Sequence, residues 1–502
     1  MLGKSYILVV VGIILAKGLG FFRDIIFAGT FGEAVEAAIY SQVFGLVNLI
    51  FTGIGVALSS LVIKNLNKAE NAGREKAYAA SFLRKSIFWL ILAAAGVALF
   101  AKPIVNVILS DLSPEETALA VKMMYLMAPS LIFVVVAYIV SGLLQNKQVY
   151  FITSIMSLPF NVLIISTLLF ENVDIMAVAL VTTIGWFLHI VIQLPAFYKK
   201  GYSFLEKNDK SLAKKDKNPE ILWIFISNMM FQLCVYIDRA FVGSADVPAI
   251  KYASDLFITI SSVFVVAMST VVFPAISKNY EEGQISYVNE LVQYIITIMT
   301  AIFLPFLLVV GFFGEDVIRL FYEGGNFTHD LTITVSKMFF IYSLGILGYV
   351  AQDLFNKILY LAGKYKYTVI GTIVVVIANV LLNIGIGSIN MDEYGTFDKS
   401  ALTASVTSVL LTLYAVAIAI GIKKVVGPYF KKGLLEDIGK IFISGICATA
   451  VYILFNTFLK EFTHGYITFL IPLAACGITY IAVLYFTGIL KRLMKRERED
   501  VK

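Results

Sequence analysis

The chain has 502 residues, of which 59% are hydrophobic and only 15% are charged. Soluble domains are usually about half apolar and about a quarter charged, so this composition excludes an ordinary soluble globular protein. The formal net charge of +6 does not indicate nucleic-acid binding, because the basic residues gather in short segments between apolar blocks, as in the cytoplasmic loops of membrane proteins.

Apolar blocks follow one another along the whole chain. Blocks of about 20 to 25 residues are long enough to cross a bilayer core, so they predict an all-α polytopic membrane protein with about fourteen transmembrane helices. No small-residue cleavage site follows the first block, which we therefore interpret as a helix of the mature protein. The expected spans are 5–28, 37–63, 84–110, 119–144, 150–170, 174–198, 219–243, 251–276, 285–313, 331–361, 367–389, 400–422, 437–459 and 466–489.

The loops between these spans predict orientation and domains. The exits of the second, sixth and twelfth spans and the C-terminal tail are rich in lysine and arginine, whereas the intervening loops are acidic or neutral. Both termini are therefore expected in the cytoplasm. The longest polar stretch separates two six-helix halves of equal orientation, the form of a parallel repeat. We expect an N-terminal lobe at 1–201, a basic cytoplasmic linker at 202–218, a C-terminal lobe at 219–425, and a final helix pair with a basic tail at 426–502.

Charged residues inside the first span are the sharpest candidates for a functional site. Lys17, Arg23 and Asp24 interrupt its apolar sequence, close to Gly18 and Gly20. A charge in the membrane costs about 2.5–3.5 kcal/mol and usually faces a cavity. The glycines predict a bend or unwinding that exposes these charges to a water-filled space. The alternative is that the charged side chains reach the outer interface.

A second group of polar residues suggests a cation site. Asp238 and Arg239 interrupt the seventh span, and Asn379 and Asn383 lie one turn apart on the eleventh. Together with a hydroxyl such as that of Thr403, the carboxylate and amides would offer the hard oxygen ligands that Na⁺ prefers. The alternative is that the amides simply join helices.

Other polar residues favour structural roles. Two acid–base pairs at a spacing of four residues, Lys251 with Asp255 and Asp353 with Lys357, fit a neutralising bridge as well as a functional pair. His189 is expected to be a packed residue. Three thiols in apolar blocks are expected to be small buried hydrophobes: Cys234, Cys447 and Cys476.

The sequence contains no phosphate-binding loop, zinc-protease motif or nucleophile elbow. We therefore expect a transporter without catalytic residues or a bound organic cofactor. Transport would be driven by an ion gradient, the membrane potential or the gradient of the substrate.

Seven short motifs resemble one known family along nearly the whole chain. They are residues 18–32, 55–60, 237–239, 273–278, 324–328, 351–353 and 383. In this order they are similar to the MurJ (MviN) lipid II flippases of the MOP exporter superfamily, which have fourteen helices.

The resemblance implies a function in cell-wall synthesis and cell shape. Members carry an undecaprenyl-pyrophosphate-linked disaccharide peptide from the cytoplasmic to the outer leaflet of the bacterial inner membrane by alternating access. We expect a monomer that contacts membrane lipids and no nucleic acid. The resemblance places Lys17, Arg23, Asp24, Arg239 and Asp255 at the substrate, where arginine suits a pyrophosphate because its planar group donates two parallel hydrogen bonds.

Two departures from the family pattern leave the substrate open. Phe51 and Thr52 stand where the family usually has an arginine, and Asp255 stands at another such position. Another polyprenyl-linked oligosaccharide is therefore an alternative substrate. A MATE-like ion-coupled exporter is a further alternative, although such exporters normally stop at twelve helices. A membrane-embedded glycosyltransferase would need a catalytic carboxylate motif that the sequence lacks.

Overall fold

The computed structural model describes residues 2–71, 74–109, 112–206, 227, 229–242, 246–388, 399–459 and 466–493. The chain divides into two compact units. Unit 1 comprises Met1–Tyr252, Gly324–Leu331 and Asn379–Gly395, and unit 2 comprises Ala253–Glu323, Thr332–Ala378 and Thr396–Lys502. Residues 207–226, which contain most of the expected linker, lie outside the described part, so the lobe boundaries stay a prediction.

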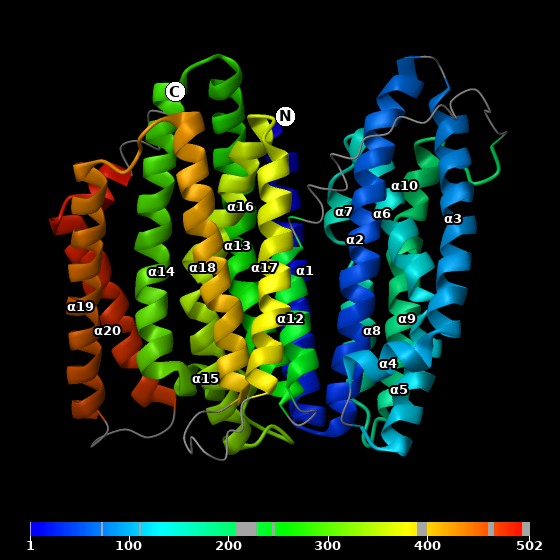
Figure 1. Ribbon diagram of the computed structural model, residues 1–502, viewed down its shortest axis with the longest axis horizontal. Coiled ribbons are helices and arrows are strands. Elements are labelled where there is room, and N and C mark those ends of the chain that lie inside the picture. Colours follow the sequence, from blue (N-terminus) through cyan, green and yellow to red (C-terminus); the bar gives the residue numbers. More distant parts are fainter. Residues whose placement is uncertain are drawn as a thin grey trace. The chain divides into compact units, whose positions relative to one another are not determined.

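Unit 1 is a bundle of helices in which α2 packs along α6 and α8 along α9 (Figure 1). Helix α1 packs along α8. Its helices are α1 (Leu2–Phe31), α2 (Val35–Asn71), α3 (Glu75–Leu99), α4 (Ala101–Ile108), α5 (Pro114–Met127), α6 (Ser130–Asn146), α7 (Phe151–Ser154), α8 (Leu158–Leu168), α9 (Ile175–Val191), α10 (Leu194–Lys199) and α12 (Met230–Phe241).

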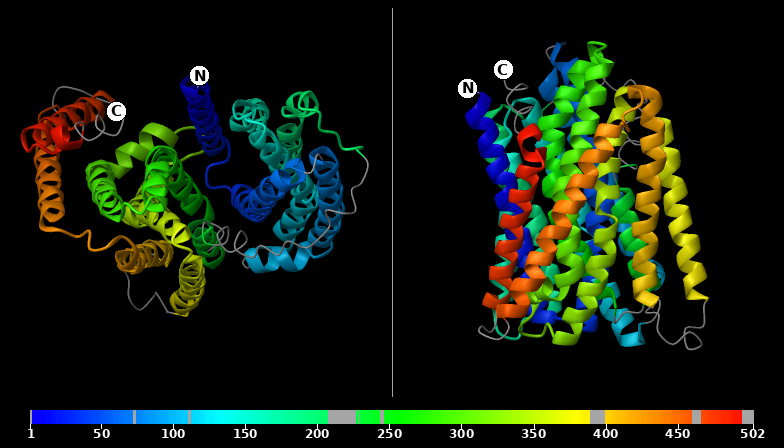
Figure 2. Two further views of the ribbon diagram at one scale, coloured as in Figure 1. Left: turned by 90° about the horizontal axis from the view of Figure 1, so that it is seen from above. Right: turned by 90° about the vertical axis from the view of Figure 1, so that its left-hand side faces the viewer.

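Unit 2 holds most of the remaining helices, and within it α16 packs along α18 and α14 along α19. These helices are α13 (Val247–Glu281), α14 (Ile285–Tyr322), α15 (His329–Leu344), α16 (Ile346–Leu361), α17 (Tyr365–Gly387), α18 (Lys399–Val426), α19 (Lys432–Leu459) and α20 (Tyr466–Phe486). The first residues of α13 and α15 and the last residues of α17 belong to unit 1. In both views of Figure 2 the long helices within each unit run roughly parallel.

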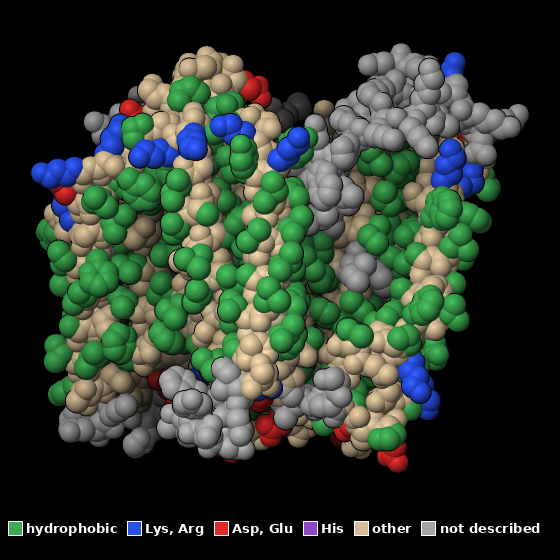
Figure 3. Space-filling model, viewed as in Figure 1, with side chains coloured by type: hydrophobic (Ala, Val, Ile, Leu, Met, Phe, Trp, Pro, Cys, Tyr) green, Lys and Arg blue, Asp and Glu red, His purple; other side chains and the backbone are tan. Residues whose placement is uncertain are grey.

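The length and the apolar composition of the helices suit a bilayer. In the described part of the chain, eleven helical segments are long and apolar enough to cross a membrane, and the three other expected spans coincide with α1, α12 and α13. Large apolar side chains such as Phe170, Ile420 and Phe486 are 62–85% exposed, which suits contact with lipid and not water. On the face shown in Figure 3, hydrophobic side chains cover the middle of the helices and basic side chains gather near their ends. The all-helical, multi-pass membrane fold is confirmed.

The first helix does not unwind at its glycines, whereas the expected bend stays a prediction. Helix α1 is unbroken from Leu2 to Phe31, and residues 17–24 are regular helix. Both glycines fit this helix: a Cβ atom at Gly18 would meet nothing within 4 Å, and one at Gly20 would be 3.6 Å from Nδ2 of Asn161. The glycines therefore leave room beside the helix and do not break it.

Two smaller expectations also need correction. The third span consists of two helices, α3 and α4, which meet at Phe100. Cys234 and Cys476 are buried as expected, but Cys447 is exposed. It follows the exposed Ile446 on α19, so this thiol lies on an apolar outer face of the helix.

The end of α1 is fixed by a loop that lies far away in sequence. The backbone N–H of Asn326 donates to the carbonyl of Gly29 at 2.8 Å, and the hydroxyl of Tyr252 donates to that of Gly32 at 3.0 Å. Gly32 has a left-handed φ of +52°, and a Cβ there would overlap the backbone oxygen of Asn326. Only glycine suits this close approach.

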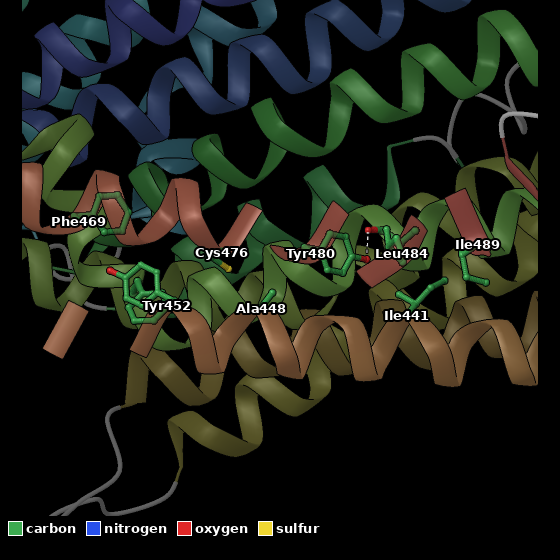
Figure 4. Packing of buried hydrophobic residues seen from close by; sticks show 10 residues of the cluster. Ile441, Ala448, Tyr452, Phe469, Cys476, Tyr480, Leu484 and Ile489 are labelled. Atoms are coloured by element: carbon green, nitrogen blue, oxygen red, sulfur yellow. Dashed lines mark hydrogen bonds between the residues drawn. The ribbon is translucent and has the colours of Figure 1, made fainter. Parts of the chain in front are cut away.

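The last two helices form a core of their own against α14 (Figure 4). Tyr452 of α19 packs its ring against Phe313, and the hydroxyl of Tyr480 of α20 donates to the carbonyl of Ala301 at 2.6 Å. At the end of this core, Arg492 makes an ion pair with Asp437. These contacts attach α19 and α20 to the rest of unit 2.

Candidate functional site

Arg23 is the centre of a compact polar cluster in unit 1. Its Nε and Nη2 atoms donate to Oδ1 of Asp24 at 3.0 and 2.7 Å, and its Nη1 atom donates to Oδ1 of Asn161 at 3.1 Å. The guanidinium carbon lies 5.7 Å from the ring centroid of Phe44 and 5.4 Å from that of Phe160. The Arg23 and Asp24 side chains are 16% and 15% exposed, so the ion pair is largely shielded but remains reachable.

Helix α8 supplies the neighbours of Arg23 from one side. Proline in its first turn suits a helix start, since the missing N–H has no partner to lose there. The next two residues, Phe160 and Asn161, are both buried. The amide of Asn161 also donates to the carbonyl of Ala16 at 3.4 Å, so this side chain joins α8 to α1 at two points.

The ring of Phe160 is held from behind by α9. It lies 5.0 Å from the ring of Trp186 and 5.5 Å from that of His189. A Cβ at Gly185 would be 2.6 Å from Cδ2 of Phe160, so α9 needs glycine there to let the ring approach. His189 is buried in this aromatic group, as expected of a packed residue.

Helix α2 lies next to both arginines of the predicted site. Phe44 lies beneath Arg23, and a Cβ at the next residue, Gly45, would be 3.4 Å from Nη1 of Arg239. Arg239 itself is 7% exposed. Two adjacent residues of α2 therefore contact the two arginines that the sequence singled out.

For the remaining residues predicted to bind substrate, membership in this cluster stays a prediction. Lys17 lies on α1, but a separation of six residues on a regular helix turns it about 120° away from Arg23. Asp255 belongs to unit 2, and its role stays a prediction. The side chains of Phe51 and Thr52 lie outside the described residues.

The predicted cation ligands from α12 and α17 do come together. Oδ1 of Asp238 accepts hydrogen bonds from Nδ2 of Asn379 at 3.0 Å and from Nδ2 of Asn383 at 3.1 Å. The two amides also bond to each other, at 3.3 Å. All three side chains are at most 1% exposed. An isolated buried carboxylate is costly, and these charge-assisted bonds offset part of that cost.

The chemistry of this group suits a hard cation. It offers carboxylate and amide oxygens, and Oδ1 of Asn383 is buried without a hydrogen-bond partner among the described residues. Thr403, the fourth predicted ligand, is buried in unit 2, so its membership in the group stays a prediction. The first three residues therefore offer the types of oxygen ligand that Na⁺ prefers, although the amide nitrogens of both asparagines face the carboxylate.

The structure bears on the two other acid–base pairs. Lys357 and Asp353 form an ion pair within α16, as a neutralising bridge requires. Lys251 places its ammonium 5.2 Å from the ring centroid of Phe27 and 4.8 Å from that of Tyr252, and its pairing with Asp255 stays a prediction. Cation–π contact thus accounts for part of the stabilisation of this buried lysine.

Comparison with known proteins identifies the family. The family model described as lipid II flippase MurJ matches residues 27–475. The lipid II flippase MurJ of Thermosipho africanus is 24% identical over 500 residues, covering 98% of each chain. A probable lipid II flippase MurJ of Buchnera aphidicola subsp. Baizongia pistaciae is 25% identical over 411 residues, covering 78% of this chain and 79% of the relative.

Solved structures show the same fold. A lipid II flippase MurJ in an inward closed conformation superposes with a TM-score of 0.77 at 21% identity, covering 97% of this chain and 99% of the other. An inward-facing multidrug resistance MATE transporter of the MOP superfamily gives a TM-score of 0.60 at 13% identity, covering 82% and 95%. The fold is thus shared with both groups, but the family model selects one of them. The chain belongs to the MurJ family of lipid II flippases.

Proposed function

We propose that this protein moves lipid II, the undecaprenyl-pyrophosphate-linked precursor of peptidoglycan, from the cytoplasmic to the outer leaflet by alternating access. Membership of the MurJ family supports the substrate, and a multi-pass membrane protein without catalytic motifs fits a transporter. The observation that carries the proposal is the shielded Arg23 cluster inside a membrane helix. Charges are placed in the membrane where they meet a polar substrate.

The geometry of the cluster suggests how the head group is held and released. Arginine binds a phosphate oxygen pair with its planar fork, and the low surrounding polarity strengthens this contact. Asp24 already accepts two hydrogen bonds from the same guanidinium. Because Asp24 shares this guanidinium, it would weaken the attraction for the pyrophosphate and so favour the release that a carrier requires.

Sodium is the proposed coupling ion. Asp238, Asn379 and Asn383 would hold it, with Thr403 as a further ligand. Bound Na⁺ would supply a positive charge next to the carboxylate. Each amide would then have to turn its oxygen towards the ion, because Nδ2 of both asparagines now faces Asp238. Ion binding would thereby change how α12 and α17 are joined, which is a physical basis for coupling.

The protein is proposed to act as a monomer with both termini in the cytoplasm of a bacterial cell. The basic last turn of α18, Lys423 and Lys424, supports this orientation. The head group then enters from the side at which it is synthesised.

Depletion and reconstitution together test the proposed function. Depletion in the native host should accumulate lipid II in the cytoplasmic leaflet. The purified protein in vesicles should move lipid II, but not a polyprenyl-pyrophosphate oligosaccharide without the peptide, to the outer leaflet. Accumulation of a different lipid-linked glycan, or transport of that glycan alone, would assign the protein to the alternative substrate class.

A further inference from the structure

We propose that Asn161 is a positioning residue for the substrate: it orients the guanidinium of Arg23 without cancelling its charge. The inference rests on the proposed function, because it concerns how an anionic head group is recognised. Asn161 is not among the site residues expected from the sequence.

The contacts fix the guanidinium in three directions. Asp24 accepts hydrogen bonds from Nε and Nη2, and Asn161 accepts one from Nη1. The rings of Phe44 and Phe160 border the charged group. Asn161 is itself immobile, since it is 3% exposed and its Nδ2 atom donates to the carbonyl of Ala16. Because arginine loses much side-chain entropy on binding, a guanidinium held in place binds an oxyanion more tightly.

The type of acceptor matters as much as its position. Arg23 and Asp24 together are formally neutral, so a second carboxylate on the guanidinium would make the cluster an anion. Such a cluster would repel pyrophosphate. The amide oxygen of Asn161 accepts a hydrogen bond without adding charge. A neutral acceptor at residue 161 is therefore what a site for an anionic ligand requires.

An aspartate at residue 161 distinguishes a positioning role from structural support. Asn161→Asp has the same shape and retains an oxygen for Nη1 of Arg23, now as a stronger charge-assisted bond. It loses the amide donor to the carbonyl of Ala16, so a purely structural role predicts a lower melting temperature but unchanged binding by the folded protein. A role in binding predicts that it loses affinity for pyrophosphate more severely than Asn161→Ala, although its hydrogen bond to Arg23 is stronger.

The experiment measures binding, transport and thermal stability of the full-length protein in lipid nanodiscs and vesicles. The probes are lipid II and undecaprenyl pyrophosphate, which carries the same anion without sugar or peptide. We expect Asn161→Ala to weaken binding of both probes by about tenfold and Asn161→Asp to weaken it further. The matched control is Gln193→Ala, which removes another buried amide of unit 1 whose Nε2 donates to the carbonyls of Ala137 and His189. It should lower the melting temperature and leave binding by folded protein unchanged.

A double substitution tests whether Asn161 acts through Arg23. In an Arg23→Lys background, Asn161→Ala should reduce binding much less than in the wild type, because lysine lacks the planar group that Asn161 orients. An equal, additive loss in both backgrounds would overturn the inference, as would wild-type affinity in a folded Asn161→Asp protein. If the Asn161→Asp protein does not fold, binding by the Asn161→Ala protein and by the double variant still tests the inference.

Failure of the proposed function gives a different result. A wild-type protein that binds undecaprenyl pyrophosphate but does not bind or move lipid II would refute the proposed substrate. The effect of Asn161 on pyrophosphate binding would still support the inference. A wild-type protein that binds neither probe would overturn both.

Discussion

The hydroxyl of Tyr480 donates a hydrogen bond to the carbonyl of Ala301, at 2.6 Å (Figure 4). In a helix this carbonyl would accept from the N–H four residues later, but that residue is Pro305, which has no N–H. Tyr480 of α20 thus satisfies a backbone acceptor of α14 that would otherwise stay unpaired in the membrane. The contact explains how a proline is accommodated within α14 and why α20 packs there.

Replacement of Tyr480 by phenylalanine should therefore destabilise the protein. Tyr480→Phe leaves the carbonyl of Ala301 without this partner and should cost about 1 kcal/mol. Tyr452→Phe is the matched control, because Tyr452 belongs to the same core and its hydroxyl has no hydrogen-bond partner among the described residues. It should be neutral or stabilising. Thermal unfolding in one detergent compares the two variants, and equal melting temperatures would contradict the prediction.

Gly32 should tolerate alanine less well than Gly283 does. Both have a left-handed φ, +52° and +75°, so each substitution carries a conformational cost of about 1–2 kcal/mol. At Gly32 the new methyl group would also collide with the backbone of Asn326, whereas at Gly283 it meets nothing within 4 Å. Gly32→Ala should lower the melting temperature clearly more than Gly283→Ala. A similar loss of melting temperature in both variants would contradict the prediction, because it would mean that the loop at Asn326 moves aside for the methyl group.

Composition and block length were enough to predict the fold class. Each apolar block had to form its backbone hydrogen bonds internally, and in a membrane only a helix or a closed barrel does so. Local breaks were less predictable. Phe100, where α3 and α4 meet, lies three residues before Pro103, which is in the first turn of α4 and lacks the N–H that would bond to the carbonyl of Leu99, so the sequence carried a mark of this boundary that the predicted span ignored. The glycines of α1 gave the opposite error: they fit an unbroken helix and leave space beside it.

Only part of the two sites could be predicted, because a single sequence does not show which residues the fold brings together. Asp238, Asn379 and Asn383 stood out because polar groups in apolar spans need partners, and they proved to be partners of one another. Asn161 met the same criterion as an isolated amide in the fifth span and deserved the same weight. Phe44 and Phe160 carried no signal among 39 phenylalanines, because only the folded structure brings their rings to Arg23.

Cysteine labelling tests the proposed orientation. In a variant that lacks the three native thiols, a cysteine at Lys431 should be shielded from a membrane-impermeant reagent in intact cells, and one at Glu115 should react. Both positions are exposed: Lys431 lies between two apolar spans, and Glu115 lies in the first turn of α5, at the end of its span, so accessibility reports the side of the membrane. Permeabilised cells provide the control, in which both should react. Labelling of Lys431 in intact cells would reverse the orientation and the direction of transport.

Arg23 should require the guanidinium group and not merely a positive charge. Arg23→Lys loses the fork that contacts Asp24 and Asn161, so it should support only part of the transport rate, and Arg23→Ala should support none. Arg319→Lys is the control: this arginine is 37% exposed and pairs with acidic neighbours on α14. It should transport normally. Full transport by a well-expressed Arg23→Ala protein would remove Arg23 from the binding site.

The proposed sodium site depends on the carboxylate of Asp238. If Asp238, Asn379 and Asn383 hold Na⁺, saturating sodium should raise the melting temperature of the wild type, since a hundredfold excess over Kd stabilises by about 2.7 kcal/mol. Asp238→Asn removes the charge and retains the shape, so it should abolish this shift. Choline replaces sodium in the reference buffer to keep ionic strength equal. Asp437→Asn is the control, because this carboxylate pairs with Arg492 and should affect stability without changing the sodium response. A sodium-dependent rise in melting temperature that persists in folded Asp238→Asn protein would exclude this group as the cation site. Loss of this rise together with loss of sodium-dependent transport would show that sodium binding at this site is coupled to transport.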